Sequence, residues 1–397
     1  MIKRIAKVVS MATVLLVSPL VGAQPSVLDN TKPWSERMIE SEMVRFPEAW
    51  QIDWDESAQW DYVHGLNLLA VSKVYLHTKN QRYLDYILGY YDMLVNDDGT
   101  ISTYDIDKYN IDMINPGKVL FFLYEETGQT KYKKAADLLR KQLDSHPRTN
   151  EGGFWHKKRY PEQMWLDGLY MGAPFYAEYI VRYGDMAELD DVFLQFELIE
   201  ANLYDEKTGL PRHGWDASKA QKWADETTGL SAHHWSRALG WYAMAMVDVL
   251  EIVPAKHPKS AWLRAKFQTF IDATLAYQDN TGTWYQVTDL AEREGNYLEA
   301  SGTSMITYAI AKGVALKLLP EHYRDHAEKG FAGLIDQMIS VNPSDNVISL
   351  NQVCAVAGLG GKPYRDGSFD YYLSEPIRAN DAKGVGPFIL AALYLGK

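Results

Sequence analysis

One carboxylate is notable for the residues around it. Asp167 lies among Met, Trp, Leu and Tyr in the segment 164–171, and the basic run 157–159 precedes it. Asp is rarely buried without a partner or a purpose. Aromatic neighbours desolvate a carboxylate and favour its protonated form, so Asp167 could donate a proton near neutral pH. Because aromatic rings stack on sugars and basic side chains bind anions, we predict an enzyme acting on an acidic carbohydrate.

The alternative for Asp167 is an acidic residue in the first turn of a helix, beside ordinary core aromatics. Polar and aromatic residues recur just before other apolar helical runs as well. If those helix ends share one mouth, the side chains should converge there. From these segments we select Tyr62, Asp112, Trp165, His213, Trp215, Trp235 and Arg237. Each could instead serve as a helix cap or a neighbour of one, since Asp and Ser are favoured at N-caps.

Several other chemistries lack their sequence signatures. The chain has no His-Glu-x-x-His and no spaced Cys/His set for zinc. It also has no glycine-rich phosphate loop that opens a helix after a strand, and no Gly-x-Ser-x-Gly nucleophile elbow. We therefore expect an enzyme that uses no metal and no cofactor.

The elements that must position these residues are helical. Apolar helical runs recur near small residues at Gly65, Gly117, Gly172, Gly240, Gly302 and Gly386. The first five are each followed by a more amphipathic helix, such as 132–139. Such recurrence is typical of repeated helical hairpins, with the wholly apolar helices inside. We predict an all-α fold, an (α/α)6 toroid or six-hairpin barrel.

The two ends of the chain should close this toroid. The apolar run 387–394 is predicted to be an inner helix that pairs with an N-terminal helix over 34–50. An open solenoid is the alternative, but the C-terminus has no polar cap. Strand signals are few, and 283–287 is either a short strand or an extended loop.

The bulk composition limits where the protein works. Residues 1–23 have a basic start, an apolar run and small residues at the end, which predicts a signal peptide followed by a single catalytic domain over 24–397. We expect export to the bacterial periplasm or beyond.

The formal net charge of −12 disfavours nucleic acid and anionic membranes as partners. The only cysteine, Cys354, predicts a buried structural thiol, and we expect a monomer.

Four segments, 109–118, 155–174, 213–216 and 223–244, resemble glycoside hydrolase family 105, the unsaturated rhamnogalacturonyl hydrolases. The family 88 glucuronyl hydrolases are more distant relatives. The resemblance covers most of the chain after the predicted signal peptide. Its most specific parts are the blocks 164–171 and 235–241.

The resemblance implies an (α/α)6 barrel that removes an unsaturated uronic acid from the non-reducing end of lyase-made oligosaccharides. In this family an acid protonates C4 of the C4=C5 bond, water adds at C5, and the resulting hemiketal opens. By the same resemblance, Asp167 is the acid/base and Asp112 its carboxylate partner. The residues that would line the subsite are His213, Arg237, Trp235, Trp241 and Lys157. The identity of the next sugar, in a rhamnogalacturonan-type or ulvan-type fragment, stays open.

Three other functions remain as alternatives. An inverting glycosidase would use two opposed carboxylates at the anomeric carbon. A sugar epimerase could use paired histidines such as His233 and His234, and a noncatalytic glycan-binding protein would depend on the aromatic residues alone. Loss of ultraviolet absorbance from lyase products distinguishes these functions, because only hydration of the double bond removes that chromophore.

Overall fold

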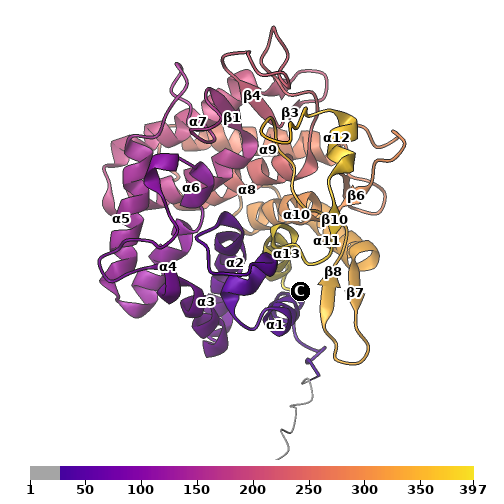
Figure 1. The fold of residues 1–397 in the computed structure, drawn as a ribbon. Helices are drawn as coiled ribbons and strands as arrows, with labels where there is room; N and C mark the ends of the chain where they lie inside the picture. Colours follow the sequence, from indigo (N-terminus) through magenta and orange to yellow (C-terminus); the bar gives the residue numbers. More distant parts are fainter. Residues whose placement is uncertain (1–26) are drawn as a thin grey trace, which may run out of the picture.

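The computed structural model describes residues 27–397, so the predicted signal peptide, 1–23, lies outside the described residues. Helices dominate and form two concentric layers (Figure 1). The inner helices are α2 (Tyr62–Thr78), α4 (Gly117–Thr127), α6 (Leu166–Tyr183), α8 (Ser236–Ile252), α10 (Ala300–Ala315) and α13 (Ala382–Leu395). Their outer partners, in the same order, are α3 (Gln81–Leu94), α5 (Thr130–Asp144), α7 (Leu189–Asn202), α9 (Ser260–Leu275), α11 (Tyr323–Met338) and α1 (Trp34–Arg45).

The inner helices form a closed ring. Each one contacts the next, and α13 contacts both α10 and α2. The helix α1 packs on α13, so the two ends of the chain make the sixth hairpin. This confirms the predicted (α/α)6 toroid and excludes the open solenoid. The first helix is shorter than predicted: it ends at Arg45, and a 3-10 helix, η1 (Ala49–Trp54), follows. The reason is Pro47, which disfavours helical geometry at the residue before it.

The recurring glycines have a packing role. A Cβ atom on Gly65 would lie 2.5 Å from Cα of Pro116, which directly precedes α4. One on Gly240 would lie 2.6 Å from Cβ of Met305 on α10. Real side chains do not come that close, so neighbouring inner segments can approach only where the Cβ is missing. The internal repeat of the sequence therefore marks the contact points of the inner ring.

The outer layer shows the expected amphipathic pattern. On α5 the buried residues include Tyr132, Ala135, Ala136, Leu139 and Leu143, which follow the spacing of one helix face. On α8 and α10, by contrast, nearly every residue is buried. None of the helices within 27–397 combines the length and the apolar character that a bilayer crossing requires.

Short antiparallel ribbons occur in the loops beside the inner helices. They pair β1 (Gln163–Trp165) with β4 (Gly214–Asp216), β2 (Tyr204–Asp205) with β3 (Leu210–Pro211), β5 (Trp284–Tyr285) with β6 (Leu298–Glu299), β7 (Ile339–Val341) with β8 (Ile348–Leu350), and β9 (Val353–Cys354) with β10 (Ile377–Arg378). Within 283–287, where the sequence left a short strand or an extended loop open, the structure has a two-residue strand, β5. The remaining elements are α12 (Phe369–Ser374), η2 (Ile106–Lys108), η3 (Ile111–Ile114) and η4 (Met186–Glu188). The ribbon of β1 and β4 directly positions two of the predicted site residues, Asp167 and His213.

Candidate active site

The ribbon of β1 and β4 brings Asp167 and His213 together. In its register Trp165 lies opposite Gly214, and the backbone N–H of Leu166 donates to the carbonyl of His213 at 3.1 Å. Asp167 is the second residue of α6, directly after this ribbon. Its Oδ2 lies 3.2 Å from Nε2 of His213. The two atoms are close but lack the alignment of a hydrogen bond, since both remain unpartnered by that criterion.

His213 is held from its other side. Its Nδ1 lies 2.7 Å from the hydroxyl of Tyr372 on α12, and the histidine side chain is fully buried. Tyr372 is 159 positions away in sequence. It fixes the ring so that Nε2 points toward Asp167. The sequence contained no signal for Tyr372, because the contact depends on a loop returning from the far end of the chain.

Asp112 lies in η3, beside the basic run. Its backbone neighbour Ile111 donates to the carbonyl of His156 at 3.2 Å, which aligns the two segments. Lys157 Nζ donates to Asp112 Oδ2 at 2.5 Å, and His156 Nε2 lies 3.4 Å from Oδ1. Burial alone would raise the pKa of Asp112, but the charge of Lys157 and its hydrogen bond hold the pKa below its ordinary value. Asp112 is therefore an ionised carboxylate at neutral pH.

Asp112 and Asp167 both act on the ring of His156, because the negative charge of each favours its protonated form. Burial lowers the pKa of His156 to about 4, so the imidazole is neutral near pH 7. The ring stacks on Trp165 with centroids 4.3 Å apart. A Cβ on Gly168 would lie 2.7 Å from its Nδ1, so a glycine is required there. We had not selected His156 from the sequence, although it directly precedes the basic run.

The site contains an unusual concentration of unsatisfied polar atoms. Asp112 Oδ1, Asp167 Oδ2, His156 Nδ1 and His213 Nε2 are all buried, and none has a hydrogen-bond partner within residues 27–397. Most buried polar atoms in folded proteins are hydrogen-bonded, so exceptions need an explanation. Asp112 Oδ1 lies 3.4 Å from His156 Nε2 and Asp167 Oδ2 lies 3.2 Å from His213 Nε2, so these unbonded atoms concentrate where the two aspartates meet the two histidines.

The predicted tryptophans differ in position. Trp165 contacts the catalytic candidates but is only 5% exposed, because His156 and Tyr160 stack on it. Trp215 is tied to the loop by a hydrogen bond from its Nε1 to the carbonyl of Thr228 at 3.2 Å. Little of either ring is open to a sugar.

Trp235 and Trp241 lie behind the site rather than lining it, which corrects the prediction for both. Each is 1% exposed. Trp235 packs against His213 and donates to Gln286 Oε1 at 3.0 Å. Trp241 stacks on Tyr170 one helical turn deeper, with centroids 4.8 Å apart. Neither ring face is available to a substrate.

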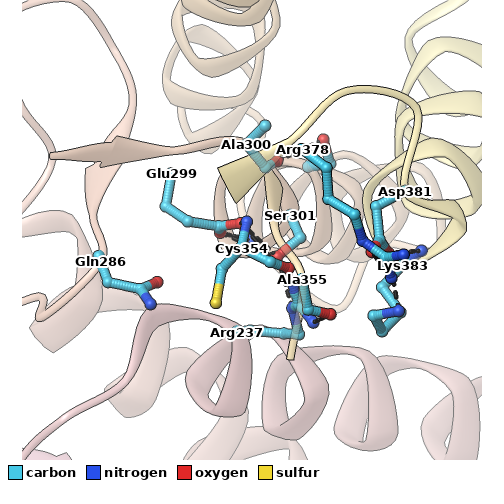
Figure 2. A network of polar contacts seen from close by, with 12 residues as sticks. Arg237, Gln286, Glu299, Ala300, Ser301, Cys354, Ala355, Arg378, Asp381 and Lys383 are labelled. Atoms are coloured by element: carbon cyan, nitrogen blue, oxygen red, sulfur yellow. Dashed lines mark hydrogen bonds and ion pairs between the residues drawn. The ribbon is translucent and has the colours of Figure 1, made fainter. Parts of the chain in front are cut away.

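Arg237 belongs to a separate network of polar contacts with Ser301 and the chain at Cys354 and Ala355 (Figure 2). Its guanidinium is 1% exposed, donates to Ser301 Oγ at 2.7 Å and to the carbonyl of Ala355 at 3.3 Å, and also bonds to the carbonyl of Cys354. In this arrangement it holds the chain at β9 rather than a substrate carboxylate. Asp225, an acid near Arg237 in sequence, is exposed and is not the partner of this buried guanidinium.

The acid beside Arg237 is Glu299, with Oε1 3.8 Å from Nη2. Glu299 caps α10: its carboxylate accepts from the N–H of Gly302 at 2.7 Å and from the N–H of Cys354 at 3.0 Å. Ser301 Oγ lies 2.7 and 2.8 Å from its two oxygens. The Cys354 thiol is buried, as predicted, and burial raises its pKa to about 11.

Three cavities surround the mouth of the ring. They measure about 530, 490 and 1010 Å³. The first and second share Asn110, the second and third share Arg159, and the first and third share Val356, so the three adjoin. Tyr62 lines the first and Lys157 the second. Burial and the charges of neighbouring aspartates raise the pKa of Tyr62, so its hydroxyl stays protonated.

The loop of residues 361–365 lines the largest of these cavities, next to Tyr160. The paired histidines lie elsewhere. His234 is fully buried, with Nδ1 2.9 Å from the carbonyl of Pro211 and Nε2 3.1 Å from Thr208 Oγ1. Both of its ring nitrogens serve the loop, which disfavours the epimerase alternative. Across 27–397, no group of three His, Cys, Asp or Glu side chains is arranged to hold a metal ion.

The comparisons with known proteins agree with this geometry. The model of Glycosyl Hydrolase Family 88 matches residues 34–395. A solved family 105 glycoside hydrolase from C. acetobutylicum is 48% identical, with a TM-score of 0.88, over 92% of this chain and 99% of that one. Protein Atu3128 of Agrobacterium fabrum is 38% identical over 56% of this chain and 96% of that protein. Unsaturated rhamnogalacturonyl hydrolase YesR of Bacillus subtilis is 28% identical over 70% of this chain and 76% of that protein.

Proposed function

This chain is a glycoside hydrolase of families 88 and 105, and we propose that it removes a 4,5-unsaturated uronic acid from the non-reducing end of lyase-made oligosaccharides. The similarity to a protein named as an unsaturated rhamnogalacturonyl hydrolase supports this substrate class. The expected substrates are rhamnogalacturonan-type or ulvan-type fragments.

The observation that carries the proposal is the pair Asp167 and His213. Their facing atoms, Oδ2 and Nε2, are 3.2 Å apart, buried and without hydrogen-bond partners. A carboxyl group in such a place can give a proton to a carbon atom and later take one from water, because its Oδ2 has no hydrogen-bond partner within residues 27–397. Tyr372 and the ribbon of β1 and β4 keep both side chains in position.

In the proposed reaction, Asp167 protonates C4 of the substrate's C4=C5 bond and positive charge develops at C5 and the ring oxygen. Water then adds at C5 and loses its proton to Asp167, which restores the acid. The hemiketal that forms opens and releases the rest of the oligosaccharide. Asp112, kept ionised by Lys157, stabilises the positive charge of the intermediate.

The uronic acid's own carboxylate needs a cation. Since Arg237 is engaged with the protein, we assign this role to Lys157 and Arg159, which line the 490 Å³ cavity beside Asp112. Lys157 is 15% exposed, so its ammonium can contact Asp112 and a ligand at once. A charge-assisted hydrogen bond to a carboxylate is the strong kind. The net negative charge of the chain makes such a local cationic site necessary.

The test is the fate of the double bond. We expect loss of ultraviolet absorbance when the enzyme meets lyase-made oligosaccharides, and deuterium at C4 of the released keto-sugar when the reaction runs in deuterium oxide. Conventional hydrolysis at the anomeric carbon would leave C4 unlabelled and would overturn the hydration mechanism. A panel of defined unsaturated disaccharides then identifies the preferred next sugar.

The cellular setting belongs to the same proposal. We propose that residues 1–23 are cleaved as a signal peptide and that a single monomeric domain, 24–397, works in the periplasm or outside the cell. N-terminal sequencing of the mature protein and its mass in solution test both parts. An uncleaved N-terminus in the native host would contradict export by this route.

A further inference from the structure

The opposite end of the ring holds a separate cavity of about 310 Å³. Its charged and polar lining residues are Lys73, Lys118, Glu178, Arg182, Asp248, Glu251, Tyr308 and Lys312. Lys118 is the second residue of α4, and the others lie in the middle or later parts of inner helices that begin at the mouth. From Asp167 to Glu178 the helix α6 advances about 16 Å, at about 1.5 Å per residue. The cavity is therefore distinct from the candidate active site.

The acidic residues of this cavity have partners. Lys312 Nζ lies 2.7 Å from Asp248 Oδ1 and 2.8 Å from Glu251 Oε2. The hydroxyl of Tyr308 also donates to Asp248 Oδ1, at 2.7 Å. Glu178 pairs with Arg182 at 2.7 Å. Each of these carboxylates already has a cationic partner, although Asp248 and Glu251 share Lys312, so the cavity does not need a further cation.

Lys118 is the exception. Its side chain is nine-tenths buried or more, since the residue is only 5% exposed, and its Nζ has no hydrogen-bond partner in 27–397. The ammonium lies 3.5 Å from the centroid of the Tyr170 ring, and the hydroxyl of Tyr170 is also buried without a partner. A cation–π contact offsets part of the cost of burying a charge but supplies no hydrogen-bond acceptor.

Burial lowers the pKa of Lys118 to about 7, and the charges of Lys312 and Lys73 oppose its protonation further, although Asp248 favours it. An anion in contact with Nζ would reverse this effect. The rest of the lining is apolar, from Leu69, Pro174, Val181, Ile252 and Leu390. Such a wall suits a carbon skeleton rather than a bare inorganic ion.

We propose that this cavity binds a small organic acid with one carboxylate, which accepts a hydrogen bond from Lys118 Nζ and places its carbon chain against the apolar wall. A single negative charge is preferred, because Asp248 and Glu251 repel a second one. The cavity volume lies near the lower end of the range for small-molecule sites, about 300–1,000 Å³. This site is independent of the proposed hydrolase activity.

The test uses butanoate as the probe, with calorimetry on the full-length protein. We expect saturable binding that butanamide, the neutral analogue, does not reproduce. Lys118→Met keeps the apolar stem and removes the charge, so the affinity should fall at least about tenfold. Lys141→Met removes an exposed cation on α5 instead and should leave butanoate binding unaltered.

Lys118→Met should fold at least as stably as the parent chain, because it removes an unpaired buried charge. If it does not fold, Lys73→Met tests the same cavity from α2 and should weaken binding. Equal binding of butanoate by the Lys118 variant and the parent would overturn the proposal. Absence of saturable binding to the parent, or equally tight binding of inorganic phosphate, would overturn it as well.

Discussion

Two buried carboxylates near the mouth, Asp112 and Glu299, each lie beside a cation but differ in how fully they are bonded. Both oxygens of Glu299 have hydrogen-bond partners, and the nearby Arg237 donates to backbone carbonyls and Ser301. Asp112 has Lys157 on one oxygen, while its other oxygen is unbonded. Charge and burial are the same in kind for both carboxylates. The difference in hydrogen bonding separates a structural cluster from the cluster for which we propose a catalytic role.

The structural cluster still affects the site, but indirectly. Arg237 holds the chain at Cys354 and Ala355, and the next residue, Val356, lines two of the mouth cavities. Arg237 is therefore a positioning residue for the cavity wall. Changing it should alter stability first, whereas changing the unbonded groups should alter turnover first.

The largest effect should come from Arg237→Ala. Breaking a buried ion pair leaves Glu299 without its cation, which typically costs about 3–5 kcal/mol of unfolding free energy. Urea unfolding measures this loss. Arg237→Lys should not restore stability, because an ammonium cannot reproduce the planar fork. A variant with unchanged unfolding would place Arg237 among the substrate-binding residues after all.

Asp167→Asn should show the opposite behaviour. The amide has nearly the same shape, so unfolding should hardly change, while turnover should fall at least about 100-fold, as expected for loss of a general acid. Steady-state kinetics with an unsaturated disaccharide measures this. The matched control is Asp336→Asn on the exposed side of α11, which should keep both activity and stability. Near-normal turnover in the Asp167 variant would exclude it as the proton donor.

His156 should make a large contribution to the loss of folding stability at acidic pH. Its unfolded-state pKa is about 6.5, and burial lowers the folded value to about 4. The unfolded chain binds the proton more tightly, so the stabilisation by neutral His156 is present above pH 6.5 and is lost as pH falls toward 4. By pH 4.5 the loss should be about 2 kcal/mol.

His156→Gln should flatten that slope in unfolding experiments between pH 7 and 4.5. His146, whose pKa burial also lowers to about 4, stays in the variant and supplies an internal reference. If the slope is identical in the two proteins, the folded His156 is not kept neutral by burial.

The smallest effect should come from Tyr372→Phe, which removes one hydrogen bond to His213 Nδ1. Losing such a bond costs about 1 kcal/mol, or roughly a fivefold change in rate. We expect lower kcat with little change in KM, together with a shifted pH profile, because the hydroxyl sets the orientation of the imidazole. A change in KM alone would mean that Tyr372 contacts the sugar instead.

The ring could be predicted from the sequence because its signal is local and repeated. Glycines such as Gly65 and Gly240 mark contacts between inner helices, and the apolar runs follow them. Asp112 and Asp167 were predictable for a similar reason, since each begins or precedes a helix at the same end of the ring.

What the sequence did not predict depends on loops that return from far away. Tyr372 reaches His213 across 159 positions, and Arg237 meets the carbonyl of Cys354 across 117. Trp235 and Trp241 have the composition of a sugar platform, but loops and neighbouring helices cover them. Composition identifies which residues can do chemistry, while long-range packing decides which of them are accessible.

The closing of the ring by α13 has a consequence for synthesis. The ribosome makes the residues of this helix, Ala382–Leu395, after those of every other inner helix, yet they pack against α2 and α10. Until they leave the ribosome, the facing sides of α2 and α10 have no partner and their apolar surface stays in water. The ring therefore cannot close before α13 has been made, and a product that stops before residue 382 carries an open seam that proteases and chaperones can recognise.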